Sequence, residues 1–160
     1  MRPDEPNADF HDVLRAFVEH EVRFIVVGAH ALAAHGIPRA TQDLDVWIDA
    51  APANAARTWR ALAAFGAPLA DLGIEDADFT RPNVVVQVGV PPNRVDILTG
   101  VTGLRFEDAW TTRTEGLIEG VRVPVLGREA LVRNKRAAGR HKDLGDVEAL
   151  EGETRRPRAT

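Results

Sequence analysis

Apolar and polar residues alternate along the chain with two periodicities, one helical and one of two residues, and these predict its helices and strands. A helical spacing opens the chain behind a cap at Asn7 or Asp9, with apolar residues at Phe10, Val13, Leu14, Phe17 and Val18. The run RFIVVG, which ends at Gly28, is typical of a buried strand. The alanine-rich stretch AHALAAHG that follows predicts a short helix with a glycine stop.

A period of two marks the strand that follows Pro38. Two alternating sets of side chains share it, one apolar and one polar: Leu44, Val46 and Ile48 against Thr41, Asp43 and Asp45. Successive side chains of a strand point to opposite faces, so both aspartates are expected on the face that does not carry the apolar set.

The remaining pattern alternates helices, strands and turns. Residues 52–64 predict a helix behind Pro52, and residues 71–83 a polar, acidic irregular segment. The turn signal PPN between the runs VVVQVGV and RVDILT favours an antiparallel hairpin. Short strands are expected within residues 114–125, and helices over 127–138 and 142–150.

These elements predict an α/β (α+β) fold in which a small mixed sheet is flanked by helices. We expect residues 1–150 to form a single domain, because 160 residues is the size of one compact domain. Residues 151–160, EGETRRPRAT, are expected to be a flexible tail.

Composition narrows the function classes. The chain has no cysteine, which excludes a disulfide framework, a thiol nucleophile and thiolate metal ligands. No apolar run approaches the ~20 residues of a membrane helix, and the polar first ten residues do not resemble a signal peptide, so we expect a cytoplasmic protein without a membrane partner. Net charge is −4, with 18 acidic and 10 basic residues up to residue 121 but 6 acidic and 10 basic residues after it.

Asp43 and Asp45 are the first candidate functional residues. Alternate residues of a strand lie roughly 7 Å apart on one face, where two carboxylates repel each other. They form either a solvated polar face or ligands of a divalent cation, for which Mg²⁺ is the natural candidate. Asp96 lies between Val95 and Ile97 on a later strand. If that strand neighbours the first, all three acids share a face and suffice for two metal ions; otherwise Asp96 is a surface acid.

Gly28 and the basic C-terminal segment supply candidate anion contacts. Gly28 is either a plain turn or the start of a helix whose free N–H groups bind phosphate. Lys135 and its neighbours in RNKRAAGRHK form either a solvated cationic face or the counter-charge of a triphosphate. Lys142 and Asp146, spaced i and i+4, are compatible with a simple surface ion pair.

The order VVGAHALAAHG, then IPRATQDLDVWID, then a later Asp resembles the DNA polymerase β-like nucleotidyltransferase superfamily. Its pattern is a Gly-Gly or Gly-Ser turn followed by Asp-x-Asp or Asp-x-Glu. The closing stretch LVRNKRAAGRHKDLGDVEAL resembles the small bacterial members that include type IV toxin-antitoxin nucleotidyltransferase toxins.

The resemblance implies roles for individual residues. Asp43 and Asp45 would bind both Mg²⁺ ions, or Mn²⁺ in their place, and Asp96 would bind the catalytic metal and assist deprotonation of the acceptor. The nucleotide contacts that the resemblance implies or makes plausible are Gly28, Ala29, Arg39, Lys135, Arg140 and Lys142. Asp143 and Asp146 would form, with the lysines, a Lys/Asp cluster that is functional in the resembling toxins. Ala29 departs from the pattern, because Gly or Ser is usual there. The backbone N–H groups, with or without His30, would then hold the phosphates; core packing or surface exposure is the alternative for His30 and His35.

The expected activity is transfer of a nucleoside monophosphate from an NTP to an acceptor hydroxyl with release of pyrophosphate. RNA or tRNA, a protein side chain and a small molecule are all compatible acceptors, and the basic C-terminal charge ranks RNA first. A protein partner of the antitoxin kind is also expected. The alternatives are a catalytically degenerate nucleotide-binding or partner module, which Ala29 favours, and a metal-dependent phosphohydrolase.

Overall fold

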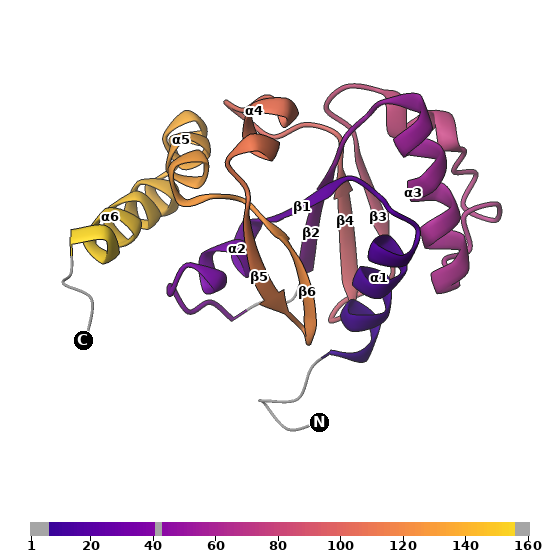
Figure 1. The fold of residues 1–160 in the computed structure, drawn as a ribbon, viewed down its shortest axis with the longest axis horizontal. Coiled ribbons are helices and arrows are strands. Elements are labelled where there is room, and N and C mark those ends of the chain that lie inside the picture. The colour runs from indigo at the N-terminus through magenta and orange to yellow at the C-terminus, as the bar shows by residue number, and fades with distance from the viewer. Residues whose placement is uncertain (1–6, 41–42, 156–160) are drawn as a thin grey trace.

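The computed structural model describes residues 7–40 and 43–155 (Figure 1). The N-terminal half runs α1 (Ala8–Glu19), β1 (Phe24–Val27), α2 (Gly28–Ala34), β2 (Asp43–Ile48), α3 (Pro52–Phe65) and the 3₁₀ helix η1 (Asp76–Thr80). The second half runs β3 (Val85–Val88), β4 (Arg94–Leu98), α4 (Phe106–Thr111), β5 (Thr114–Ile118), β6 (Val121–Val125), α5 (Arg128–Ala138) and α6 (His141–Arg155).

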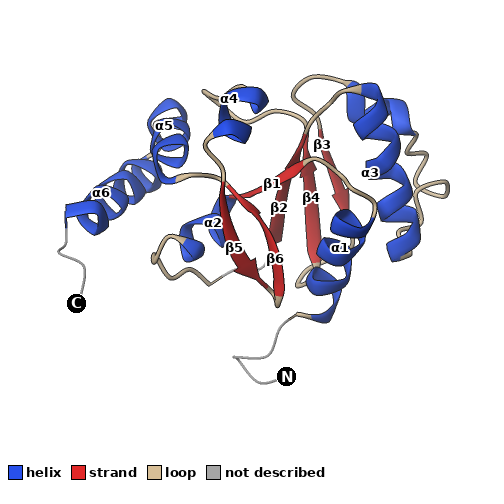
Figure 2. Ribbon diagram, in the orientation of Figure 1, coloured by secondary structure: helices blue, strands red, loops and turns tan. Residues whose placement is uncertain are grey.

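Six strands form one mixed sheet in the order β3-β4-β2-β1-β6-β5, with helices around it (Figure 2). The pairs β2–β4 and β1–β6 are parallel, and the others are antiparallel. The predicted mixed sheet flanked by helices is therefore confirmed. The antiparallel hairpin expected on either side of PPN is confirmed as β3–β4.

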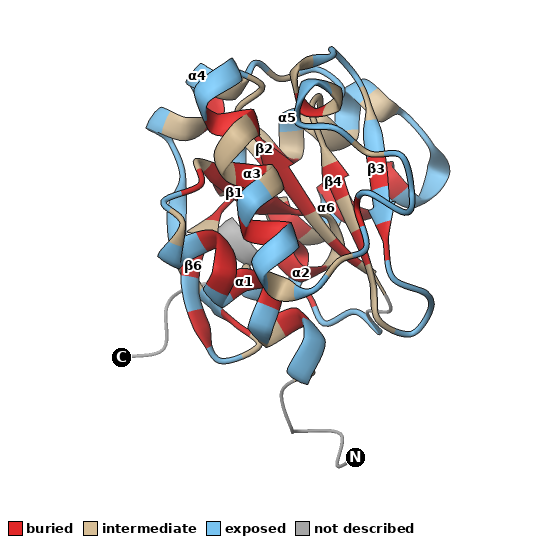
Figure 3. Ribbon diagram, turned by 90° about the vertical axis from the view of Figure 1, so that its right-hand side faces the viewer, coloured by how far each residue is buried: buried red, intermediate tan, exposed pale blue. Residues whose placement is uncertain are grey.

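The two faces of the sheet bury different residue sets. The ring of Phe17 in α1 meets the ring of Phe24 in β1 edge-on at 5.4 Å, so α1 covers the face that carries Phe24. Trp47 points the other way and meets Phe106 of α4 at 5.2 Å. Asp43 and Asp45 alternate with the buried Leu44 and Val46, and buried residues concentrate on the central strands (Figure 3). The aspartates therefore lie on the sheet face opposite α1.

Local sequence signals set several element ends. The side chain of Asn7 accepts hydrogen bonds from the backbone N–H groups of Asp9 and Phe10, which confirms the expected cap of α1. Pro52 occupies the first turn of α3, and Gly66 ends that helix in the left-handed conformation. These are the positions that proline and glycine favour at helix ends.

The structure also departs from the sequence-based expectations. The segment expected to be irregular contains η1, which a reciprocal capping box between Glu75 and Asp78 begins. The short helix α4 was not predicted, because six residues are too few to show a helical period. The last helix continues to Arg155 beyond its expected end at residue 150. Thr41 and the part of the expected tail at 156–160 lie outside the described residues.

Among the described residues, the helices are all too short or too polar to span a bilayer.

Candidate active site

Three carboxylates stand on two neighbouring parallel strands. Asp45 of β2 is in register with Asp96 of β4, and Asp43 is in register with Arg94. Period two then places Asp43, Asp45, Arg94 and Asp96 on one face. The expectation that the acids share a face is met because β4 pairs directly with β2.

Arg94 is the functional-site residue that sequence reasoning missed. Its Nη2 donates to Asp43 Oδ2 at 2.6 Å, and its Nε lies 3.2 Å from Asp96 Oδ1. The signal was present in the sequence, because Arg94 and Asp96 are two residues apart on one strand and therefore share a face. Its link to Asp43 depends on the register between β2 and β4, which the sequence does not display.

Burial and mutual repulsion perturb the acids. Burial, followed by the negative charges of Asp96 and Asp43, raises the pKa of Asp45 to about 6. Burial also raises the pKa of Asp96, although the charge of Arg94 opposes the rise. Asp96 Oδ1 is buried and lies within ion-pair distance of Arg94 Nε, but it accepts no hydrogen bond. Among the described residues, one cation, Arg94, therefore faces the three carboxylates of this cluster.

Gly28 brings the α2 turn against this cluster. Its φ is +69°, a conformation that glycine adopts without strain. A β-carbon at Gly28 would lie 2.2 Å from Asp45 Oδ2, so only a residue without a side chain permits this approach. The glycine therefore places the backbone of the turn directly beside the middle carboxylate.

A cavity of about 380 Å³ opens between this turn, the end of β4 and the last two helices. The predicted nucleotide contacts all line it, together with one of the predicted metal ligands: Gly28, Ala29, Arg39, Lys135, Arg140, Lys142 and Asp45. Leu98, Val101 and Asn134 also line it and were not predicted. Asn134 shares helix α5 with Lys135, and its side-chain amide donates to the carbonyl of Thr102 at 3.0 Å.

Asp143 and Asp146 are buried beside the cavity and neutralise its cations. Lys135 Nζ lies 3.5 Å from Asp143 Oδ1 and 3.3 Å from Asp146 Oδ2. Arg140 Nε donates to Asp143 Oδ2 at 2.6 Å, and Arg39 pairs with Asp146. Hydrogen bonding from Arg140 lowers the pKa of Asp143, whereas burial lowers the pKa of Lys135.

This cluster corrects one interpretation of the sequence. The interpretation of Lys142 and Asp146 as a surface ion pair is wrong. Asp146 is only 2% exposed and pairs with Arg39 and Lys135 instead. The cause is the packing of α6 against α5, which turns Asp146 inward. Both Asp143 and Asp146 are thus committed to ammonium and guanidinium groups in this structure.

His30 does not reach the cavity. Its ring packs edge-on against Phe10 of α1 at 5.7 Å, and burial lowers its pKa. Phosphate binding by His30 therefore has no support in this geometry.

The three acids have the oxygen ligands that a hard divalent cation needs, but in this structure they are not arranged around one metal position. Three carboxylates, one with a buried oxygen that accepts no hydrogen bond, are the ligand chemistry that Mg²⁺ prefers. In the part of the chain that the structure describes, no three or more acidic or histidine side chains already surround one point as a metal site. Instead, the guanidinium of Arg94 lies against Asp43 and Asp96.

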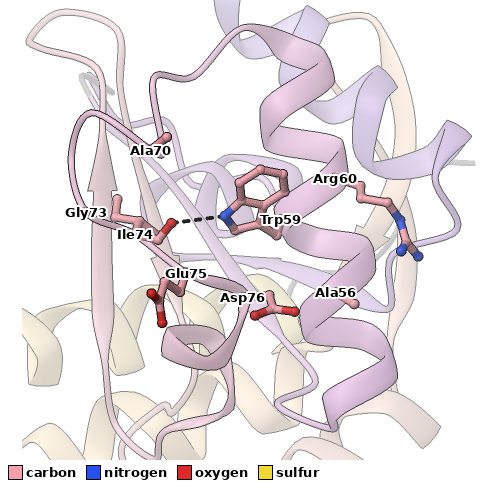
Figure 4. Close-up of a pocket in the computed structure, with 8 residues that line it drawn as sticks. All are labelled: Ala56, Trp59, Arg60, Ala70, Gly73, Ile74, Glu75 and Asp76. Carbon is pink, nitrogen blue, oxygen red and sulfur yellow. Dashed lines mark hydrogen bonds between the residues drawn. The ribbon is translucent and has the colours of Figure 1, made fainter.

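A second cavity, of about 600 Å³, lies between α3 and the segment before η1 (Figure 4). Trp59 forms one wall, and its indole N–H donates to the carbonyl of Ile74 at 3.0 Å. Glu75, on the rim, begins η1 through its capping box. Trp59 and Glu75 thus have structural partners. The candidate catalytic and nucleotide-binding residues lie instead at the cavity beside Asp45.

The chain has the fold of solved nucleotidyltransferase structures, a mixed six-stranded sheet with helices around it. No protein-family model and no curated protein matches the sequence.

Solved structures that share the fold include the following three. ANT(2")-Ia in complex with adenylyl-2"-tobramycin superposes with a TM-score of 0.58 at 14% identity over 91% of this chain and 87% of that chain. A nucleotidyltransferase-like protein of Thermotoga maritima, TM1012, gives 0.53 at 17% identity over 95% of both chains. The lincosamide antibiotic adenylyltransferase LnuA with bound lincomycin gives 0.53 at 14% identity over 93% and 98%.

Proposed function

We propose that this protein is a metal-dependent nucleotidyltransferase that moves a nucleoside monophosphate from an NTP to an acceptor hydroxyl. The observation that best supports this proposal is the position of Asp45. It is in register with Asp96 and lines a cavity that Gly28 and Lys135 also line. Carboxylates at one side and cations at the other suit a metal-bound triphosphate. The adenylyltransferases among the structural neighbours perform this class of reaction.

Different residues would contact the phosphates, offset the charge of the leaving group and accept the proton of the acceptor. The backbone of Gly28 and Ala29 would face the β and γ phosphates, while Lys135, Arg140 and Lys142 offset the charge of the leaving pyrophosphate. The acceptor oxygen attacks the α phosphorus in line, and the bond from that phosphorus to the pyrophosphate oxygen breaks. Asp96 takes the acceptor's proton, a role that suits a carboxylate whose pKa is raised by burial.

Asp43, Asp45 and Asp96 would hold Mg²⁺, which supplies polarisation of the phosphate and acidification of the acceptor hydroxyl when it is bound.

The closing helices change the balance among acceptors. The ranking of RNA first rests on the positive charge after residue 121. Three of those cations are paired within the closing helices and the connection between them: Lys135 and Arg140 with Asp143, and Arg136 with Glu151. Less charge is therefore left for a phosphate backbone. We propose a small hydroxyl compound as the acceptor, in keeping with the tobramycin and lincomycin in the neighbouring structures.

The second candidate is a nucleotide-binding module without turnover. Ala29 lines the cavity where the superfamily pattern has Gly or Ser, so a serine hydroxyl toward phosphate is missing.

Label transfer tests the proposal. The protein is incubated with Mg²⁺, the four α-³²P-labelled NTPs and, separately, the small-molecule, RNA and protein fractions of a cell extract. We expect label to enter the small-molecule fraction and Asp45→Asn to abolish it. Label in RNA, with binding that weakens by orders of magnitude between about 50 and 200 mM salt, would identify RNA as the acceptor. Labelled NTP that binds but is never consumed would support the binding module, and product released with water alone would indicate a phosphohydrolase.

A further inference from the structure

Arg94 is the one cation in direct contact with the strand carboxylates, judged over the described residues. It bridges two of them, with Nη2 2.6 Å from Asp43 Oδ2 and Nε 3.2 Å from Asp96 Oδ1. A longer hydrogen bond of 3.5 Å runs from Nη2 to Asp96 Oδ2. The guanidinium therefore contacts both oxygens of Asp96 and one of Asp43.

The strand register fixes this bridge. Arg94 is the direct neighbour of Asp43 across the parallel pair and precedes Asp96 by two residues on its own strand. Asp96 is only 13% exposed in its side chain, whereas Arg94 is 31% exposed. Arg94 is therefore the more exposed of the two partners.

A guanidinium and a divalent cation cannot share these oxygens. Both are positive, so they repel at contact distance, and both need the same carboxylate lone pairs. In this structure Arg94 pairs with Asp43 and Asp96, and the described residues contain no cluster of three acids or histidines arranged as a metal site.

We propose that Arg94 is an internal counter-ion that competes with the divalent cation for Asp43 and Asp96, and must leave them before the metal binds. This inference rests on the proposed function, because it takes the same acids as metal ligands. A metal-bound triphosphate would favour the state in which Arg94 has left the acids, so nucleotide and metal should each strengthen the binding of the other. Arg94 acts here as a positioning residue: it holds the acids in their metal-free arrangement.

Direct metal binding tests this, measured by calorimetry with Mg²⁺ or Mn²⁺ alone and no nucleotide. Wild-type protein, Arg94→Gln and Arg94→Lys are compared, and unfolding curves in chelator confirm that each is folded. Arg122→Gln is the matched control, because Arg122 also lies on a strand of the sheet and pairs with a carboxylate, Glu115, but is 74% exposed. Asp43→Asn reports whether the measured binding is at the acids.

We expect Arg94→Gln to bind the metal roughly tenfold more tightly than wild type, since two partly exposed ion pairs no longer oppose it. Arg94→Lys keeps the charge but loses the planar fork, so its affinity should fall between the two. Arg122→Gln should match wild type. A non-hydrolysable NTP should tighten metal binding in wild type and have less effect in Arg94→Gln.

Equal or weaker metal binding by Arg94→Gln would overturn the proposal while leaving the metal site of the proposed function intact. If Arg94→Gln does not fold, Arg94→Lys takes its place. The proposal is then overturned if Arg94→Lys binds the metal no more tightly than wild type. Absence of metal binding in every variant, wild type included, would overturn this inference and the metal dependence of the proposed function together.

Discussion

Gly28 and Asp45 touch so closely that a β-carbon at Gly28 would stand 2.2 Å from Asp45 Oδ2 and 3.1 Å from its Cγ. The phosphate turn and the acid cluster are thus one packed unit. Any side chain at residue 28 must displace the middle carboxylate.

Gly28→Ala should therefore lose both stability and activity. We expect a loss of roughly 2 kcal/mol in the free energy of unfolding, from the left-handed backbone and the contact with Asp45 together. Two controls separate these causes. Gly66 has φ +105° with nothing within 4 Å of an added β-carbon, so Gly66→Ala reports backbone strain alone. Gly145→Ala lies in α6 with open space and should stabilise slightly. A Gly28→Ala protein as active as wild type would contradict the geometry.

Asp45→Asn should abolish transfer, by more than about 100-fold, without destabilising the metal-free protein at pH 7. The substitution removes a buried charge that faces Asp43 and Asp96. Asp43→Asn should also abolish transfer, but it breaks the ion pair with Arg94 and so gains no stability. Label transfer and denaturant unfolding check both variants. Near-wild-type transfer in either would remove that acid from the site.

The pH dependence of stability should carry the signature of Asp45. The pKa of this group is raised from 3.8 to about 6 in the folded protein, so the native state holds its proton more tightly than the unfolded chain. Its stabilising contribution is complete below about pH 4 and is lost as the pH rises through 6. Allowing for partial exposure, we expect a loss of about 1–2 kcal/mol.

The measurement is the difference in unfolding free energy between wild type and Asp45→Asn in chelator, from pH 4 to pH 7. Titrating groups that do not interact with Asp45 cancel in this difference, so it reports Asp45 together with its coupled neighbours Asp43 and Asp96. Parallel profiles would show that Asp45 is not perturbed.

Lys135→Ala should destabilise the closing helices and weaken NTP binding. Removing the ammonium leaves the buried Asp143 and Asp146 with fewer partners, at a cost of about 1–3 kcal/mol. Lys142→Ala is the matched control: Lys142 lines the same cavity but is exposed, so its loss should leave stability within about 0.5 kcal/mol of wild type. Thermal unfolding and nucleotide titration compare the two. Equal stability losses would contradict the role of the buried ion pairs.

The acid cluster could be predicted because its signal is local. Period two in DLDVWI and RVDIL assigns each aspartate to a face, and the PPN turn places β3 beside β4. The pairing of β4 with β2 then follows from the resemblance and is present in the structure.

Two ion pairs of the site could not be predicted, because their partners are far apart in the sequence. Arg39 meets Asp146 only because α6 packs beside the α2 turn, and Arg94 meets Asp43 only through strand register. His30 was weighed as a phosphate ligand, but its direction depends on the position of α1. Polar side chains offer several equivalent partners, and tertiary packing chooses among them.

The parallel pairing of β2 with β4 also has a consequence for how the protein is made. Asp43 and Arg94 meet although they are 51 residues apart in the chain, with α3, η1 and β3 in between. Closing so long a loop is a slow, entropically costly step of folding. A nascent chain that has emerged only as far as α3 contains two of the acids but no site. Recovery of nucleotide binding during refolding should therefore track closure of the central strands rather than formation of the helices.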